Sequence, residues 1–143
     1  MPTVPVNYLA VLVAAVASMI IGSLWYGPLF GKPWMALMGM TPEKIAAAKG
    51  KSMAMNYGLM FVGSLVMSFV LAHSLFFVTS TYIHTTYLIV GMTVGFWSWL
   101  GFVAPVTLGS VLWENKSWNL WLLNNGYYIV TLVVMGVILA LWK

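Results

Sequence analysis

Two histidines are the side chains of this sequence best suited to handling protons or metal ions. His73 and His84 flank a short uncharged turn between two apolar segments, so their imidazoles could meet. A structural zinc site needs four ligands, whereas the whole sequence has two His, two acidic residues and no Cys. We therefore predict no metal site and no cofactor within one chain. Two interpretations of His73 and His84 stay open. The side chains pack or form hydrogen bonds at helix ends, or they handle protons or bind a metal ion in an oligomer.

The acidic side chains offer little for acid–base catalysis. Glu114 is the only acid at the end of an apolar segment, and Lys116 follows two residues later. Long charged side chains near a membrane boundary extend to water, and a general acid or base needs a partner in a pocket that excludes water. The sequence shows neither a phosphate-binding glycine loop nor a nucleophile motif. These features disfavour an enzyme.

Amide and phenol side chains lie near the starts of the second and fourth apolar segments. An amide inside hydrocarbon needs a hydrogen-bond partner. If the two segments are neighbours, these side chains would form one polar patch. The patch would join helices through hydrogen bonds, or it would line a binding pocket or a permeation path. Its predicted members are Asn56, Tyr57, Asn124, Asn125 and Tyr128.

The composition requires a membrane around the elements that position these residues. Of the 143 residues, 62% are hydrophobic and 6% are charged, whereas a soluble domain has roughly 25% charged residues. A soluble fold of this length would lack polar groups to cover its surface, so the bilayer is the solvent. The net charge of +4 comes from lysines between apolar segments, a pattern typical of membrane topology signals rather than of nucleic-acid binding. We predict membrane lipids, and no nucleic acid, as partners.

We predict an all-α polytopic membrane protein with a single transmembrane domain, residues 1–143. Roughly 20 apolar residues cross a bilayer as a helix. The long connection after the first span contains Thr41, a capping residue, followed by Pro42 and Glu43, which together begin a short helix. Apolar residues in this connection suit the membrane surface, so the short helix is predicted to be interfacial. The four predicted spans cover residues 6–26, 53–78, 84–113 and 118–142.

The third span carries a proline and two tryptophans inside its apolar stretch. Pro105 has no backbone N–H and is expected to kink the helix. The Thr107 hydroxyl or a neighbouring helix can satisfy the freed carbonyl group. Trp97 and Trp99 fall near the middle of the membrane. Because an indole N–H at that depth needs a partner, at least one of these rings is predicted to face protein.

Small side chains recur on one face of the first span and form a glycine pair in the third. Residues four positions apart share a helix face, and small residues there let another helix approach closely. A bundle of this size leaves some of these faces uncovered, so we expect a homo-oligomer. The predicted packing residues are Ala10, Ala14, Ser18, Gly22, Gly91 and Gly95.

The lysines set the expected orientation. Four spans place the long connection and the turn at Glu114 on the same side of the membrane, and five of the six lysines lie there. Lysine-rich loops stay in the cytoplasm, so both termini are predicted to lie outside. Tryptophans favour the lipid–water boundary and gather at the same edge, at Trp25, Trp34, Trp113, Trp118 and Trp121.

The two halves of the chain read alike at the ends of the first and third spans. Residues 22–25 and 109–113 close these spans, and residues 56–58 and 125–127 stand in the helices that follow. Two duplicated helical hairpins, related by an axis along the membrane normal, would produce this pattern. Boundary residues also resemble one another in any aromatic-rich membrane protein, so both interpretations stay open.

A long aromatic run and three separate positions carry a family resemblance. The run is Gly-x-Leu-Trp-Tyr-x-x-Leu-Phe-Gly-Lys-x-Trp at residues 22–34, and the positions are Asn7, Gly126-Tyr127 and Gly136. They resemble a family of small bacterial four-helix membrane proteins of unknown function, over most of the chain. The resemblance implies the four-helix fold and the bacterial inner membrane. It supplies no activity, cofactor or site residue.

Three classes of function follow. The leading one is a non-enzymatic integral membrane protein with a structural, lipid-binding or accessory role, which a closed apolar groove would favour. The second is a small pore or transporter for a small solute, lined by the asparagines and tyrosines. The third is a membrane enzyme acting on a lipophilic substrate, which would need a pocket joining His73, His84 or Glu114 to a ligand.

Overall fold

The computed structural model describes residues 3–48, 53–81 and 85–142, and the regular structure of these residues is entirely helical. Within this described part, four helices are long and apolar enough to cross a membrane. The prediction of an all-α polytopic membrane protein with four spans is therefore confirmed. The spans are Tyr8–Leu29, Met53–Thr81, Tyr87–Leu112 and Trp118–Leu141.

Wider π-helical turns interrupt the first and third spans. The π-helical turn of the first span contains Pro28, and that of the third span precedes Pro105. A proline has no backbone N–H, so it cannot donate a hydrogen bond within the helix. The described elements, in chain order, are α1 (Tyr8–Leu24), η1 (Trp25–Leu29), α2 (Gly31–Leu37), α3 (Pro42–Ala48), α4 (Met53–Thr81), α5 (Tyr87–Ser98), η2 (Trp99–Val103), α6 (Ala104–Thr107), α7 (Gly109–Leu112) and α8 (Trp118–Leu141).

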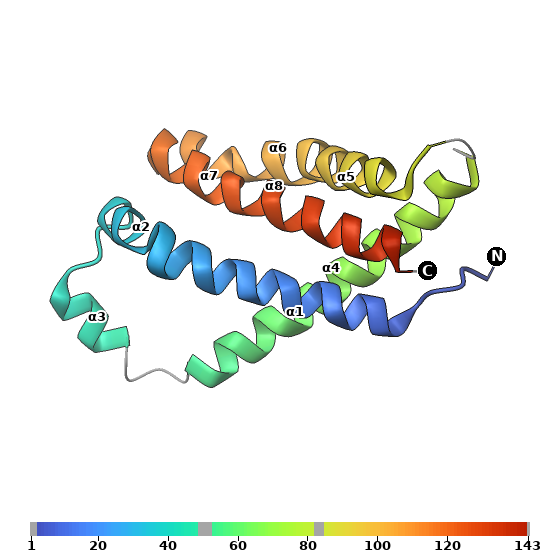
Figure 1. Cartoon of the computed structure of the whole chain (residues 1–143). Coiled ribbons are helices and arrows are strands. Elements are labelled where there is room, and N and C mark those ends of the chain that lie inside the picture. The colour runs from blue at the N-terminus through green and yellow to red at the C-terminus, as the bar shows by residue number, and fades with distance from the viewer. Residues whose placement is uncertain (1–2, 49–52, 82–84, 143) are drawn as a thin grey trace.

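The four spans form a bundle in which one helix is splayed. Figure 1 shows α5 and α8 side by side, with α1 next to α8. Helix α4 crosses α1 obliquely, so its second half packs in the bundle and its first half lies apart. The described chain begins and ends at one end of the bundle, which we name the terminal end. Helices α2 and α3 lie at the opposite end, which we name the connection end.

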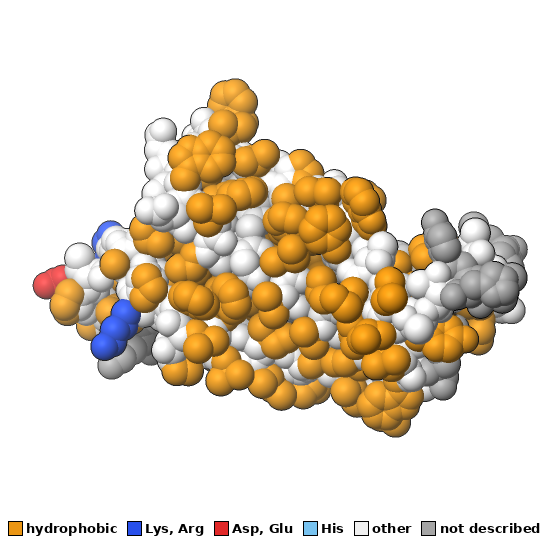
Figure 2. All heavy atoms as spheres, turned by 45° about the horizontal axis from the view of Figure 1, so that its top comes forward, with side chains coloured by type: hydrophobic (Ala, Val, Ile, Leu, Met, Phe, Trp, Pro, Cys, Tyr) orange, Lys and Arg blue, Asp and Glu red, His pale blue; other side chains and the backbone are white. Residues whose placement is uncertain are grey.

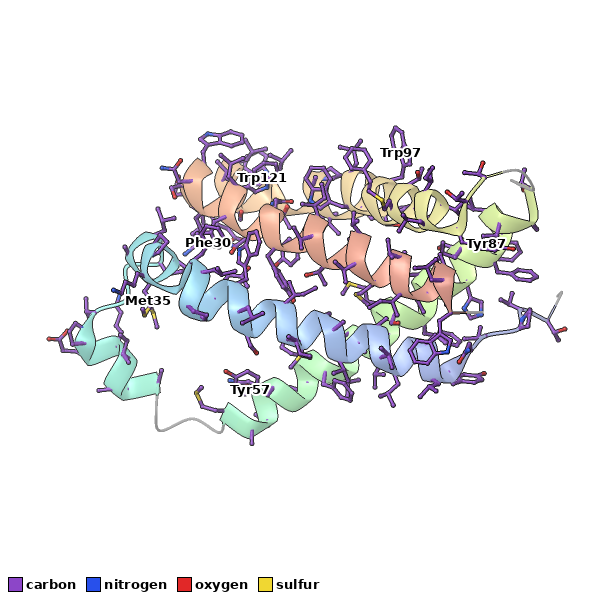
Figure 3. The ribbon with its side chains drawn as sticks, in the orientation of Figure 1. Phe30, Met35, Tyr57, Tyr87, Trp97 and Trp121 are labelled. Carbon is purple, nitrogen blue, oxygen red and sulfur yellow. The ribbon has the colours of Figure 1, made fainter. Side chains whose placement is uncertain are left out.

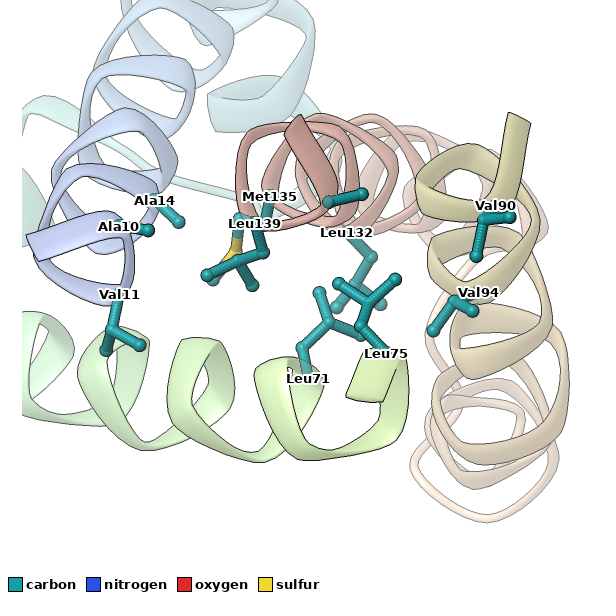
Figure 4. Close-up of a cluster of buried hydrophobic side chains, with 11 residues drawn as sticks. Ala10, Val11, Ala14, Leu71, Leu75, Val90, Val94, Leu132, Met135 and Leu139 are labelled. Atoms are coloured by element: carbon teal, nitrogen blue, oxygen red, sulfur yellow. The ribbon is translucent and has the colours of Figure 1, made fainter. Parts of the chain in front are cut away.

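The apolar core lies in the half of the bundle nearer the terminal end. Side chains from all four spans point toward a common centre there (Figure 4). Helix α1 contributes small residues, which bring it close to its neighbours, and the larger side chains come from α4, α5 and α8. Residues buried in this core include Ala10, Ala14, Leu71, Leu75, Val90, Val94, Leu132, Met135 and Leu139.

Glycines bring the backbones of α5 and α8 into direct contact. A Cβ atom built on Gly95 would lie 2.5 Å from the carbonyl oxygen of Leu132, and one on Gly91 would lie 2.8 Å from the carbonyl carbon of Gly136. Gly136 in turn faces the Gly91 carbonyl. No side chain fits in these positions, so the pair of helices depends on glycine for its close approach.

The two sequential hairpins, α1–α4 and α5–α8, have different packing. In a duplicated hairpin, Trp25 and Trp113 would occupy equivalent positions. Trp25 donates its indole N–H to a carbonyl of α8, whereas Trp113 is exposed. Asn125 is buried, whereas Asn56 is exposed. These differences do not support a duplicated hairpin.

The long connection forms two short helices at the connection end. Helix α3 begins where predicted, because the Thr41 hydroxyl accepts a hydrogen bond from the backbone N–H of Lys44 at 3.3 Å. Figure 2 shows apolar side chains over the visible face of the bundle and charged side chains at the connection end only. This distribution fits a bundle surrounded by lipid with a charged edge in water.

Candidate functional site

Asn125 is the centre of a buried hydrogen-bond network between α8 and the third span. Its side chain is 3% exposed. Its Oδ1 accepts from the Trp99 indole N–H at 3.0 Å, and its Nδ2 donates to the Thr107 hydroxyl at 3.1 Å. The Trp121 indole N–H donates to the same hydroxyl at 3.1 Å. Because these donors and acceptors satisfy one another, the network holds α8 against η2 and α6.

The interruption of the third span makes this network possible. Pro105 cannot donate a backbone hydrogen bond, and the chain widens so that the Ala104 N–H bonds the Trp99 carbonyl across a π-helical turn. The Thr107 hydroxyl donates to the carbonyl of Val103 at 2.8 Å. This is the usual bond of a threonine hydroxyl to its own helix, whereas Pro105 frees the carbonyl four residues before it, at Gly101. That Thr107 satisfies the freed carbonyl stays a prediction. The Thr107 hydroxyl also accepts from Asn125 and Trp121. Such π-helical turns are frequent at functional sites.

The two tryptophans of the third span face opposite ways. Trp99 donates to Asn125, as described above. Trp97 is 60% exposed, and Figure 3 shows its ring pointing away from the bundle. The prediction that at least one of these rings faces protein is confirmed.

The end of the first span docks on α8 through aromatic side chains. The Trp25 indole N–H donates to the carbonyl of Leu123 at 3.1 Å, and the Tyr26 hydroxyl donates to Oδ1 of Asn124 at 3.0 Å. The ring of Tyr26 also meets that of Tyr127, with centroids 5.2 Å apart. These contacts join residues 98 positions apart in the chain.

The residues that carry the family resemblance have packing roles at this junction. A Cβ atom on Gly126 would lie 2.9 Å from the Trp25 ring, and one on Gly22 would lie 3.3 Å from the Tyr127 hydroxyl. Both glycines therefore leave room for an aromatic ring of the other helix. At the terminal end, the side chain of Asn7 caps α1 by accepting from two backbone N–H groups at 3.1 Å.

The predicted polar patch is divided in the structure. The two asparagines of α8 lie at the interfaces just described, whereas Asn56 and Tyr57 are exposed on the first half of α4. Figure 3 shows Tyr57 far from Trp121 of the Asn125 network. The reason is the oblique crossing of α4, which carries its first half away from α8. Tyr128 is half-buried on α8, and its ring lies 5.3 Å from that of Tyr127.

His73 contacts a residue of its own helix. Nδ1 of His73 lies 2.8 Å from the carbonyl oxygen of Phe69 on the same helix. The ring centroids of His73 and Phe69 are 4.4 Å apart. His84 lies outside the described residues. Among residues 3–48, 53–81 and 85–142, no three His, Asp or Glu side chains lie close enough to hold a metal ion. A meeting of His73 and His84 stays a prediction.

Buried serines join α1 to α4. Ser18 is fully buried (0% exposed) on the small-residue face of α1, and its hydroxyl is hydrogen-bonded to that of Ser64 at 2.8 Å. One turn along α4, the Ser68 hydroxyl donates to the carbonyl of Val11 at 3.0 Å. The small side chains of Ala14 and Ser18 allow this close contact.

A groove of about 700 Å³ opens at the terminal end between α1, α4 and α8. Apolar side chains, among them Leu75, Phe76 and Leu139, form its walls. Polar side chains, among them Asn7 and Thr79, also line it. An apolar hollow with a few polar groups is the usual form of a site for an amphipathic small molecule.

Sequence reasoning missed this groove and the docking of the first span on α8. The adjacent Trp25 and Tyr26 were a usable signal for docking, because their polar atoms need partners when the rings are buried. The groove has no such signal. Its wall residues, such as Leu75 and Leu139, are of the same type as residues that face lipid.

Comparison with known proteins identifies a family without an assigned activity. Neither a curated protein nor a solved structure matches the chain. A family model described as "Protein of unknown function (DUF1761)" matches residues 9–140. This match covers nearly the whole four-span bundle, including the docking junction and the Asn125 network. The chain therefore belongs to the DUF1761 family of proteins of unknown function.

Proposed function

We propose that this membrane protein is non-enzymatic and binds one amphipathic lipid in the groove at the terminal end. The groove itself carries the proposal. Its volume of about 700 Å³ lies within the range of ligand sites in proteins, roughly 300–1,000 Å³. It is open to the surroundings of the bundle between three helices, so a lipid can enter from the bilayer without crossing the core.

The chemistry of the groove supports a ligand with an apolar chain and a polar head. The walls offer Leu75, Phe76 and Leu139 to an apolar chain. Near the end of α4, the Thr79 and Ser80 hydroxyls donate to carbonyls of their own helix, so their lone pairs remain available to accept from a ligand. The position at the end of the bundle places a polar head near water.

Native mass spectrometry of the protein released from lipid nanodiscs tests this proposal. We expect one retained lipid per chain in the wild type and its loss in Ala72→Phe, which fills the groove with a larger ring. Ser80→Trp provides a second block at the exposed rim if Ala72→Phe fails to fold. Ala54→Phe, on the exposed first half of the same helix, is the matched control and should retain the lipid. A wild type without lipid, or groove variants that retain it, would contradict the proposal.

We further propose a bacterial inner-membrane location with both termini outside. It is supported by the sequence positions of the lysines, because five of the six lie in the two connections that follow the first and third spans. The chain has no cysteine, so single cysteines report orientation cleanly. A membrane-impermeant maleimide added to spheroplasts should label Thr3→Cys and leave Glu43→Cys unlabelled until the membrane is opened. The reverse pattern would invert the orientation.

Homo-oligomer formation stays a prediction that the same mass spectra test. The first half of α4 is exposed, and Gly58 and Gly63 there have open space beside them, so another helix could approach. A defined subunit number above one, unchanged on dilution of the nanodiscs, is the expected result. Monomers alone would exclude it.

A small pore or transporter is the second candidate, supported by polar contacts inside the bundle. Tyr26 contacts Asn124 near the connection end, and Tyr127 contacts Ser18 nearer the middle of the bundle. Together these polar groups would line a path for a solute. Solute flux into proteoliposomes tests this function. Asn124→Leu should abolish a flux that passes along these residues, and Asn56→Leu should not. A membrane enzyme, the third hypothesis, would need a pocket that joins His73, His84 or Glu114 to a ligand, and neither His73 nor Glu114 is among the described residues that line the groove.

A further inference from the structure

Three methionines lie close together in the sequence at the turn between α2 and α3. They are Met35, Met38 and Met40. A methionine thioether is apolar and polarisable, and its sulfur is also a ligand for soft metal ions such as Cu(I). Met35 and Met38 are 36% and 37% exposed, so neither is taken up in the apolar core. The backbone of the turn decides whether the three sulfur atoms can reach one point.

The turn that ends α2 brings the three methionines to one place. The backbone N–H of Met40 donates to the carbonyl of Met35 at 3.0 Å, and that of Gly39 donates to the carbonyl of Ala36 at 3.1 Å. Gly39 has a φ of 63°. These features define a Schellman motif, in which the side chains at the positions of Met35 and Met40 commonly touch. Met38 has helical backbone angles and follows Met35 by three residues, so these two side chains are also neighbours.

The methionine cluster lies where an ion from water can reach it. Figure 3 shows Met35 at the connection end, away from the core of the four spans, and the charged side chains visible in Figure 2 lie at that same end. A methionine side chain has three rotatable bonds, so the sulfur atoms can turn toward a shared ion without a change in the backbone. Leucine would anchor the connection in the membrane surface equally well, whereas only methionine supplies sulfur ligands.

We propose that Met35, Met38 and Met40 bind one Cu(I) ion through their three thioether sulfurs. Thioether ligands select Cu(I) over the harder divalent ions, which prefer nitrogen and oxygen ligands. The prediction of no metal site from the sequence considered His, Cys and acidic side chains, and the thioethers are a separate class of ligand. The inference is independent of the lipid groove, which lies at the opposite end of the bundle.

Charges beside the turn favour a monovalent ion over a divalent one. The Lys44 ammonium donates to the carbonyl of Gly39 at 3.3 Å, and Lys32 is the second residue of α2, whereas Glu43 is the only acidic residue of the long connection. The repulsion between an ammonium and a metal ion doubles when the charge of the ion doubles. Thioethers are neutral and do not offset it. We therefore expect Cu(I) and Ag⁺ to bind, and Zn²⁺ not to bind.

NMR of the full-length protein in detergent, with carbon-13 in the methionine methyl groups, observes the site directly. Ag⁺ is the probe, because it shares the charge and the ligand preference of Cu(I) and is not redox active. On titration with silver nitrate in chloride-free buffer, the methyl signals of Met35, Met38 and Met40 should shift together and saturate at one ion per chain. The signal of Met92, an exposed residue of α5, should stay in place.

Competition with the Cu(I) chelator bicinchoninate, under ascorbate, measures the affinity for Cu(I). Met38→Leu should weaken binding at least about tenfold, since even the loss of an outer-shell partner costs that much. The triple variant Met35→Leu, Met38→Leu and Met40→Leu should lose binding and keep its Tm, because leucine and methionine are of similar size. Met92→Leu is the matched control and should bind as the wild type does. Cu(I) binding that persists in the triple variant, Zn²⁺ binding of equal strength, or methyl signals that do not respond to Ag⁺ would overturn the proposal.

Discussion

Helices α5 and α8 touch through their backbones, whereas α1 and α4 touch through serine hydroxyls. In the first pair, Gly91, Gly95 and Gly136 leave no side chain between the backbones at their closest contact. In the second, Ser18 and Ser68 reach across the gap with hydrogen bonds. The first pair stays together along its length, and the second separates toward the connection end, leaving a cleft of about 420 Å³ beside α1.

The comparison shows how packing and polar contact divide the task of holding a membrane bundle. Lipid tails are as apolar as leucine, so burying apolar area gives helices little reason to associate. Close backbone contact gains dispersion energy over many atoms, whereas each hydrogen bond acts at one point. A pair built on glycine is therefore expected to tolerate no added atoms, and a pair built on serines to lose little when one hydroxyl is removed.

Gly95→Leu should have the largest effect. The new side chain would collide with the backbone of α8 at Leu132. Overpacking typically costs about 1–3 kcal/mol and occasionally more, and a backbone cannot move aside as a flexible side chain can, so we expect the upper end of this range. We expect loss of folded, monodisperse protein in detergent, measured by size-exclusion chromatography and thermal unfolding. Gly63→Leu is the control, because nothing lies within 4 Å of a Cβ there. Equal stability of the two variants would show that the glycine contact is unimportant.

Asn125→Leu should have the next largest effect. The substitution leaves the indole N–H of Trp99 without its acceptor and takes one donor from Thr107. Unpaired buried polar groups cost about 1–3 kcal/mol, so the midpoint of denaturant unfolding should fall clearly. Asn56→Leu, on the exposed part of α4, should leave the midpoint unchanged. The network would be dispensable if both variants unfold alike.

Ser68→Ala should have a small effect. It removes one hydrogen bond to the Val11 carbonyl, and hydrogen bonds between membrane helices average about 0.6 kcal/mol. The control is Ser23→Ala, because the Ser23 hydroxyl bonds only the Met19 carbonyl of its own helix in the described part of the chain. A loss for Ser68→Ala as large as that for Gly95→Leu would remove the distinction between the two helix pairs.

Acidification should have the smallest effect, confined to α3 outside the bundle. The backbone N–H of Glu43 itself and the Thr41 hydroxyl hold the pKa of Glu43 below its ordinary value of 4.5. A lowered pKa in the folded helix stabilises it above pH 4.5, and this contribution is lost as pH falls through the lowered pKa. Amide NMR shifts at Lys44 should follow this titration. Glu43→Gln should remove the pH dependence, and its persistence would point to another group.

The spans and α3 were predictable because their signals are local. Apolar runs of sufficient length predict membrane helices, and Thr41 with Pro42 marks a helix start. The glycine pair at Gly91 and Gly95 likewise has a recognisable four-residue spacing. The structure places both glycines at the contact with α8.

The composition of the candidate site was less predictable, because it depends on the crossing angles of helices. Asn56 and Asn125 occupy similar positions in their spans, yet one faces the surroundings and the other a buried network. In a membrane, apolar residues surround a helix on every side, so periodicity does not identify its inner face. The partnership of Tyr26 with Asn124 depends on the register between the first and last spans, which no local pattern encodes.

The docking of η1 on α8 has a consequence for biosynthesis. Trp25 and Tyr26 emerge early from the ribosome, but their partners Leu123 and Asn124 are made 98 residues later. Domains form during synthesis from the N-terminal side, so the first span must wait in the bilayer with this edge unpaired until the last span inserts. A nascent chain stopped before residue 118 would keep its first hairpin and lack the helix that closes the bundle, which makes it a candidate for quality-control proteolysis.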